Sequence, residues 1–399
     1  MEVFKLRRLW AVQAVYETGS TLKAADLNHI SQSAVADAVS ACETDLDTRL
    51  FERSSRGMAP TAAGDIWCSR VTAAATYLKA AEDALRTRRG RTALPFQRMV
   101  TETQLRALSA IIETGNFSQA ARLLAVSQPS VHRAARELET LCGLSLWRRD
   151  GARIEPTPEA RAIAQYADLF FSEISRAREA VRELQGVMDG ALRIGALPLA
   201  RSRWLPDALA GTLRAFPDAR VSLLDGPYNE QLSALLHGRI DFLLGALRMP
   251  APEGIVQTPI FDDPFVILVR AGHPLALNFD SDKDKLTPEQ LGSLSWILPR
   301  GGTPGRDNFE AFIRAKGQAS PRRVVESASL VATQELLLRT DHAAVLSAQQ
   351  VGGSVSAGLL KVMGPPLTGS SRRIGISVRQ GFIPTQLQAI FLEHLQTTS

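Results

Sequence analysis

The sequence predicts a multidomain chain in which two α-helical domains of similar sequence precede a two-lobed α/β domain. Gly19 and Gly115, and likewise Arg53 and Arg149, recur at a constant offset of 96 residues, which indicates a duplication. From Gly190 onward, strands alternate with helices, a pattern typical of parallel α/β sheets. A chain of 399 residues is also too long for a single hydrophobic core.

The composition is that of a globular protein, with 22% charged and 45% hydrophobic residues. The net charge of +5 permits a nucleic-acid partner without showing one. The three cysteines, Cys42, Cys68 and Cys142, form no C-x-x-C pair and argue against a disulfide framework and against a thiol sensor in the C-terminal half. The six histidines have no metal-ligand spacing.

The first twenty residues have a basic start and a short apolar run, but Glu17 interrupts the run and no small-residue cleavage site follows. We therefore predict no signal peptide. Because no stretch of about 18 apolar residues occurs, we also expect no membrane span and a cytoplasmic location.

The duplication holds one register from Glu17 to Thr61 of the first copy. In the second copy, one apolar helix face ends near Gly115 and comprises Leu105, Leu108, Ile111 and Ile112. Asn116 or Ser118 can cap the short helix that follows. After a tight turn, Ser127 caps a third helix with Pro129 in its first turn, where a missing N–H costs nothing.

The third helix has two distinct faces. We expect four residues to face inward: Val131, Ala134, Ala135 and Leu138. We expect five to face mostly outward, and with Ser127 and Pro129 they are our candidate DNA contacts: Gln128, Ser130, His132, Arg133 and Arg136. A helix, a turn and a polar-faced helix fit the major groove of DNA.

The segment LSLWRRDGARIEPT predicts two short strands around Asp150-Gly151, and it carries Arg148, Arg149 and Arg153. A basic hairpin beside such a helix is a wing, which can contact phosphates or the minor groove. These elements together form a winged helix-turn-helix. From residue 158 to 188 one long helical pattern follows, which suggests a spacer and a dimer seam.

The C-terminal half predicts strands in ALRIGAL, RVSLLD, IDFLLGA, FVILVRA, LSWIL and RRIGISVR, with helices near 203–216 and 228–237. If FVILVRA and RRIGISVR are the crossovers, one lobe comprises residues 190–265 with 367–399 and the other residues 266–366. The cleft between the lobes would take a small molecule.

The segment TGNFSQAARLLAVSQPSVHRAARELETLCGLSLWRRDGARIEPTPEA resembles the N-terminal domain of the LysR-type transcriptional regulators. The chain from residue 190 resembles their effector-binding domain, which has a type 2 periplasmic-binding-protein-like fold. The resemblance divides the chain into a first winged copy (1–95), a second winged copy (96–189) and an effector domain (190–399). The extra N-terminal copy departs from the family pattern of one such domain per chain.

The resemblance implies an operator DNA, a small-molecule effector and a homo-oligomer, either dimer or tetramer, with RNA polymerase as a further partner and no cofactor. Family effectors contact the loop after the first strand and a loop across the cleft. The corresponding residues here are Leu197, Pro198, Leu199, Arg201, Gly301, Gly302, Thr303 and Arg306, with Ser329 and Ser347 beside them. N–H groups at such a Gly-rich loop could hold a carboxylate; alternatively, this is a connecting loop whose arginines pair locally.

The two copies differ in charge where DNA would lie. Residues 31–57 contain three basic and five acidic side chains, whereas residues 127–153 contain five basic and three acidic ones. At an offset of 96, Asp37 replaces Arg133 and Ser40 replaces Arg136. Because phosphate neutralisation dominates DNA affinity, the second copy is the better reader.

Four further residues of the first copy remain candidate DNA contacts: Gln32, Ser33, Arg53 and Arg56. We interpret this copy as weakened or repurposed, an interaction or dimerisation module. The alternative is a second full reader of DNA.

Enzyme functions are disfavoured, because the chain lacks G-x-G-x-x-G, a P-loop lysine and G-x-S-x-G. One rival interpretation is a small-molecule-binding adaptor that acts through protein contacts without specific DNA binding. A second rival is a solute-binding protein fused to helical arms, and the missing export signal counts against it.

Overall fold

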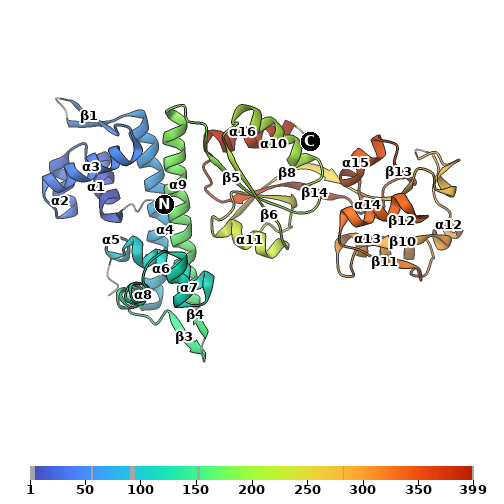
Figure 1. Ribbon diagram of the computed structural model, residues 1–399, viewed down its shortest axis with the longest axis horizontal. Helices are drawn as coiled ribbons and strands as arrows, with labels where there is room; N and C mark the ends of the chain where they lie inside the picture. Colours follow the sequence, from blue (N-terminus) through green and yellow to red (C-terminus); the bar gives the residue numbers. More distant parts are fainter. Residues whose placement is uncertain (1–4, 55–56, 90–94, 151–152, 282, 398–399) are drawn as a thin grey trace.

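The structure, a computed structural model, describes residues 5–54, 57–89, 95–150, 153–281 and 283–397 (Figure 1). The molecule is elongated: the helical copies lie at one end, and the two lobes of the α/β domain follow one another away from them (Figure 1). Among the described residues, no helix combines the length and apolar character needed to cross a lipid bilayer.

The two copies have the same order of elements. The first contains α1 (Leu6–Thr18), α2 (Thr21–Asn28), α3 (Gln32–Leu46), β1 (Phe51–Ser54), β2 (Gly57–Pro60) and α4 (Ala62–Arg89). After α5 (Phe96–Met99), the second contains α6 (Glu102–Thr114), α7 (Phe117–Leu123), α8 (Gln128–Cys142), β3 (Trp147–Asp150), β4 (Arg153–Pro156) and α9 (Pro158–Leu184). Each element of the second copy begins 96 residues after its counterpart, so the duplication extends to the fold.

Local hydrogen bonds repeat as well. The side chain of Ser31 caps α3, and that of Ser127 caps α8, each accepting from the N–H three residues on. Glu43 accepts the N–H of Leu50, and Glu139 accepts the N–H of Leu146, both at 2.8 Å. For α7, the sequence predicted either Asn116 or Ser118 as the N-terminal cap. In the structure the cap is Asn116, whose Oδ1 accepts hydrogen bonds from the N–H groups of Ser118 and Gln119.

The long helices α4 and α9 lie side by side (Figure 1). They run in opposite directions, because the end of α9 returns to the first copy, from which α4 begins: Gln185 donates to the carbonyls of Leu46 and Asp47 (Figure 1). Buried side chains at alternating three- and four-residue spacing line the two helices and belong to one shared core: Trp67, Val71, Ala74, Leu78, Ala81 and Leu85 on α4, and Ile163, Ala167, Phe170, Ile174, Ala177 and Val181 on α9. The sequence suggested a dimer seam for this apolar stripe of α9, but α4 of the same chain covers it.

The first lobe is built on a sheet of strand order β6-β5-β7-β14-β8. Its strands are β5 (Ala191–Ala196), β6 (Arg220–Leu224), β7 (Phe242–Ala246), β8 (Ile255–Asp263) and β14 (Arg372–Arg379), and its helices are α10 (Trp204–Ala215), α11 (Tyr228–Leu236) and α16 (Gln386–Thr397). Its core is formed by β5, β7 and β14 with α10 and α16.

The second lobe is built on a sheet of order β11-β10-β12-β9-β13. Its strands are β9 (Phe265–Arg270), β10 (Ser295–Leu298), β11 (Val324–Glu326), β12 (His342–Ser347) and β13 (Leu360–Val362). Its helices are η1 (Pro274–Ala276), α12 (Pro288–Ser293), α13 (Pro304–Ala315), α14 (Leu330–Arg339) and α15 (Ala348–Ser356).

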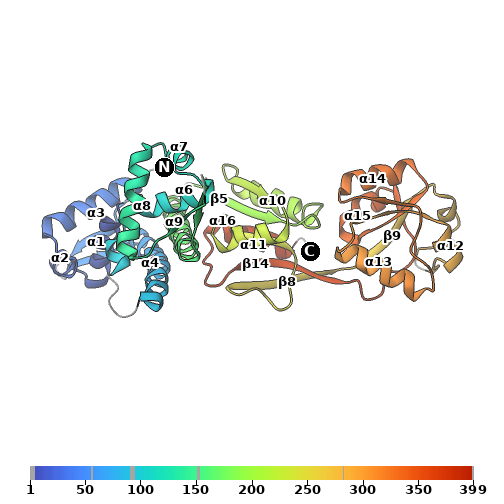
Figure 2. The ribbon, with the colours of Figure 1, turned by 90° about the horizontal axis from the view of Figure 1, so that it is seen from below.

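The chain crosses between the lobes where β8 ends and where β14 begins, and the two strands pair side by side along this connection (Figure 2). Of the two crossovers considered from the sequence, RRIGISVR is β14, at whose start the chain crosses, whereas FVILVRA is β9, inside the second sheet between β12 and β13. The preceding strand β8 makes the connection instead. Its sequence, IVQTPIFDD, shows no clean apolar alternation and contains a proline, so it was not predicted.

Candidate nucleic-acid interface and effector site

The start of α8 is fixed by local chemistry. Ser127 accepts the N–H of Ser130 at 3.3 Å and also shares a hydroxyl hydrogen bond of 2.7 Å with its side chain. Pro129 lies in the first turn, where its missing N–H leaves no bond unmade. The four residues predicted to face inward are buried: Val131, Ala134, Ala135 and Leu138. The opposite face of α8 is therefore presented to solvent.

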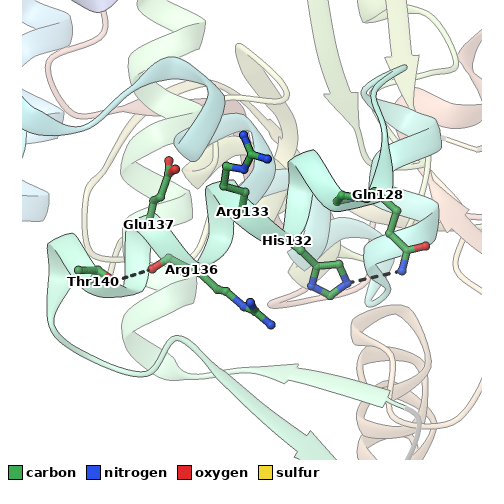
Figure 3. A pocket seen from close by; sticks show the side chains of 7 residues that line it. Gln128, His132, Arg133, Arg136, Glu137 and Thr140 are labelled. Atoms are coloured by element: carbon green, nitrogen blue, oxygen red, sulfur yellow. Dashed lines mark hydrogen bonds between the residues drawn. The ribbon is translucent and has the colours of Figure 1, made fainter.

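The exposed face of α8 borders a hollow of about 700 Å³ (Figure 3). Five predicted residues line it: Gln128, Pro129, His132, Arg133 and Arg136. In Figure 3 the guanidinium groups of Arg133 and Arg136 extend away from α8 in different directions. Glu137 and Thr140 also line this hollow and were not predicted, although their spacing of four and three residues from Arg133 and Glu137 places them on the same face.

His132 departs from the expectation of an outward side chain, because it is half-buried. Its ring stacks on Phe117 of α7 with 4.0 Å between ring centroids, and it lies 3.5 Å from the side-chain nitrogen of Gln128. Phe117 in turn meets Trp147 of the wing edge-on at 6.1 Å. These aromatic contacts hold α7, α8 and the wing together, a role that helical periodicity alone does not reveal.

The wing of the second copy is the antiparallel pair of β3 and β4. Arg148 is exposed on β3. The structure gives the backbone of Arg149 and Arg153 in these strands but does not describe their side chains, and Gly151 lies outside the described residues. A basic strand thus lies beside the exposed arginines of α8.

The first copy presents the same surface with different chemistry. Gln32, Ser33, Asp37 and Ser40 are exposed on α3, and Gln32 donates to the Thr21 hydroxyl at 2.9 Å. Arg53 is exposed on β1, whereas Arg56 lies outside the described residues. A carboxylate therefore occupies the position that an arginine has on α8.

Strand directions place the candidate effector loops at the connection between the lobes. In the first sheet, β5 and β7 are parallel, and the last residue of β7, Ala246, pairs with Ile374 near the start of β14. In the second sheet, β10, β11 and β12 are parallel, and the last residue of β12, Ser347, pairs with Phe265 at the start of β9. The carboxyl ends of both sheets therefore lie at the crossovers, where α/β proteins bind ligands.

Helices begin at this edge of the second lobe. Thr303, Ser329 and Ser347 are the N-terminal caps of α13, α14 and α15. Thr303 makes no side-chain bond to its own helix, and its hydroxyl donates to the carbonyl of Arg300. Gly301 and Gly302 are exposed beside it.

The predicted effector residues lie in different environments. Arg201 pairs with Asp225 at 2.8 Å, and Arg306 pairs with Glu310 at 2.6 Å, so each arginine has a local carboxylate. Leu199 is buried in the first-lobe core, Leu197 is half-buried and Pro198 is exposed.

Ser347 belongs to the connection between the lobes. It is fully buried and donates to Asp263 at 2.7 Å. The same carboxylate pairs with Arg372 at 2.6 Å. Asp263, the last residue of β8, thus joins Ser347 at the end of β12 to Arg372 at the start of β14.

A buried ionic cluster joins α9 to the first lobe. Arg176 has no exposed surface, contacts Glu173 and donates to Asp241 at 2.8 Å. Burial alone would lower the pKa of Arg176, but the two carboxylates outweigh burial and raise it. Burial lowers the pKa of the nearby Arg379 to about 10. The Arg176–Asp241 pair thus links the linker helix α9 to the first lobe.

The fold and the site define a class of protein: a DNA-binding regulator whose winged helices precede a two-lobed ligand-binding domain. Residues 185–399 match the LysR substrate binding domain. Residues 6–65 and 103–161 both match the bacterial regulatory helix-turn-helix protein, lysR family. The chain belongs to the LysR family of transcriptional regulators.

Similar proteins agree with this assignment. The HTH-type transcriptional regulator GalR of Pseudomonas putida is 32% identical over 382 residues, 96% of this chain and 94% of GalR. A probable hydrogen peroxide-inducible genes activator of Streptomyces viridosporus is 27% identical over 71% of this chain and 90% of its own. A full-length OxyR variant from Pseudomonas aeruginosa shares the fold, with a TM-score of 0.55 and 22% identity over 75% of this chain and 99% of its own.

Proposed function

We propose that the second copy, residues 96–189, reads operator DNA through the exposed face of α8 and the wing β3–β4, while the effector domain, residues 190–399, controls it. The observation that carries this proposal is the exposure of Gln128, Arg133 and Arg136 on one face of a capped helix beside a basic strand. Arginine and glutamine side chains form bidentate contacts with guanine and adenine in the major groove.

The double variant Arg133→Ala/Arg136→Ala tests this assignment. Its affinity for the DNA next to its own gene is measured by fluorescence anisotropy over a salt series. Each lost base contact costs about 1–3 kcal/mol, and each lost phosphate contact flattens the salt dependence by about one unit of slope. Arg214→Ala/Arg322→Ala, which removes two exposed arginines of the effector domain, is the charge-matched control.

Unchanged affinity and an unchanged salt slope in the Arg133→Ala/Arg136→Ala variant would overturn the reading assignment. That outcome would favour the adaptor interpretation, in which the protein acts through protein contacts. We further infer that the regulator acts in the compartment that holds its operator.

The effector we propose is a small molecule that carries a carboxylate, bound between the carboxyl ends of the two sheets. Support comes from the N-termini of α13, α14 and α15 at that edge, because the free N–H groups of a helix start attract anions. Arg306 lies in the first turn of α13, and a ligand carboxylate would compete with Glu310 for it.

Isothermal calorimetry with a panel of small carboxylates and their amide analogues tests the chemistry of this site. We expect binding of a carboxylate that its amide lacks, and a loss of about tenfold or more in Arg306→Met, since a charged hydrogen bond contributes about 1.5–3 kcal/mol. Arg214→Met is the control. Equal binding of acid and amide would refute the carboxylate assignment.

Such an effector can regulate only if it binds two arrangements of the protein with different affinity. We propose that closing the lobes around Asp263, Ser347 and Arg372 shifts the placement of DNA-binding domains within an oligomer. Footprints of the same operator fragment with and without the carboxylate would reveal the shift as a change in the protected length.

A further inference from the structure

The two linker helices of this chain use equivalent positions to contact each other. Each buried position on the stripe of α4 has its counterpart on α9 at an offset of 96, for example Leu78 and Ile174, or Ala74 and Phe170. Such a pair of related helices is the arrangement expected of two identical chains. Here the partner is supplied by the same polypeptide.

The polar contact across this seam is not symmetric. Arg70 of α4 and Glu173 of α9 form an ion pair at 3.7 Å, with 8% and 6% of their side chains exposed. At an offset of 96, the counterpart of Arg70 is Tyr166 and the counterpart of Glu173 is Tyr77. The seam therefore has a charge pair at one of two equivalent places and two tyrosines at the other.

This asymmetry distinguishes between partners. If α9 met α9 of a second chain in the same geometry, Glu173 would face Tyr166 instead of Arg70. The buried carboxylate would then keep Arg176 of its own helix but would lose Arg70, the cation that lies 3.7 Å from its second oxygen. A pair of α4 helices would likewise leave Arg70 facing Tyr77. Only a pair of α4 with α9 brings Arg70 and Glu173 together.

Arg70 also ties the first copy to the effector domain. Its guanidinium donates to the backbone carbonyls of Ile383 at 3.3 Å and Pro384 at 2.9 Å. At the end of α9, Gln185 donates to the carbonyls of Leu46 and Asp47 in the first copy. The first copy is therefore anchored both to the second copy's linker and to the first lobe.

We propose that the first copy is the built-in partner of the second: one chain forms a complete pair of winged domains, and the Arg70–Glu173 pair selects this pairing over a linker pair shared between two chains. Association between chains then uses surfaces other than the α4–α9 seam. The inference goes beyond the proposed function, because it holds whatever α8 binds.

Charge reversal in the full chain tests the pairing. Arg70→Glu and Glu173→Arg each place like charges in the seam, and we expect each to lower the thermal unfolding midpoint by roughly 5 °C or more. The double variant in one chain restores opposite charges and should recover part of the loss. Asp83→Lys, which disrupts the exposed Lys79–Asp83 pair on α4, is the matched control and should leave the midpoint almost unchanged.

Co-expression separates the two pairings. Differently tagged Arg70→Glu and Glu173→Arg chains can restore both ion pairs only if α4 of one chain meets α9 of the other. We expect no recovery from co-expression. Recovery of the midpoint in co-purified mixed assemblies would overturn the proposal.

Milder variants keep the test decisive if charge reversal prevents folding. Arg70→Met removes the cation beside one oxygen of Glu173, and Glu173→Gln removes the carboxylate beside Arg70, whereas the one-chain double variant makes both changes. We expect the double variant to melt no lower than the less stable single variant. Losses that simply add would show that the two side chains do not act as a pair and would overturn their role in selection.

Discussion

The double variant Asp37→Arg/Ser40→Arg gives the first copy the two arginines that the second copy has on α8. This variant should make α3 a stronger DNA-binding helix. Both positions are exposed on α3. The antiparallel α4–α9 pair places the two winged copies at its opposite ends, with their wings outermost (Figure 1). The variant tests whether a duplex that lies across the paired copies meets these side chains.

The magnitude follows from counterion release. Two added phosphate contacts steepen the slope of log affinity against log salt by about 1.8. Between about 50 and about 200 mM salt, the variant should therefore lose about tenfold more affinity than the parent, and it should bind more tightly at the lower salt. Fluorescence anisotropy with a fragment that covers the whole footprint measures both quantities.

Asp218→Arg/Ser356→Arg changes the charge of the chain by the same amount on exposed effector-domain positions. It controls for the long-range effect of net charge. If the α3 variant has the same slope as this control, α3 does not approach the duplex, and the reasoning from the paired copies is refuted.

Three further predictions concern stability and reactivity. Ser127→Ala removes the cap of α8 and should lower the free energy of unfolding by about 1 kcal/mol in urea titrations; no change would refute the cap. Burial raises the pKa of Asp168 above its ordinary 3.8, so the folded state holds this proton more tightly and ionisation destabilises it at higher pH. By calorimetry, Asp168→Asn should therefore melt above the parent near neutral pH, and the difference should vanish as the pH falls below about 4; a pH-independent difference would contradict this. The cysteines are buried, and burial raises the pKa of Cys68 to about 12. A thiol reagent should therefore label the cysteines only after the protein is denatured; rapid labelling of the native protein would contradict this.

Elements with strong local signals could be predicted from the sequence. The cap at Ser127, the inward face from Val131 to Leu138 and the hairpin strands depend on neighbouring residues, so periodicity and turn chemistry suffice. The offset of 96 found in the sequence is also the offset between each pair of counterpart elements in the structure.

Features that depend on tertiary contacts could not be predicted. The stacking of His132 on Phe117 joins two helices, and helical spacing alone gave an outward side chain. The apolar stripe of α9 was interpreted as a seam between chains, because an apolar stripe does not identify its partner. The substitution of Arg70 and Glu173 by tyrosines in the other copy was the available signal, and it becomes meaningful only when the helices are seen together.

The tandem arrangement of two winged domains in one polypeptide has an evolutionary consequence. In an assembly of identical subunits, every mutation appears twice and both halves must tolerate it. Here α3 carries Asp37 where α8 carries Arg133, a difference that is possible because each helix has its own codons. Such a regulator is free to recognise a target without inverted symmetry, and selection can refine its two halves for different tasks.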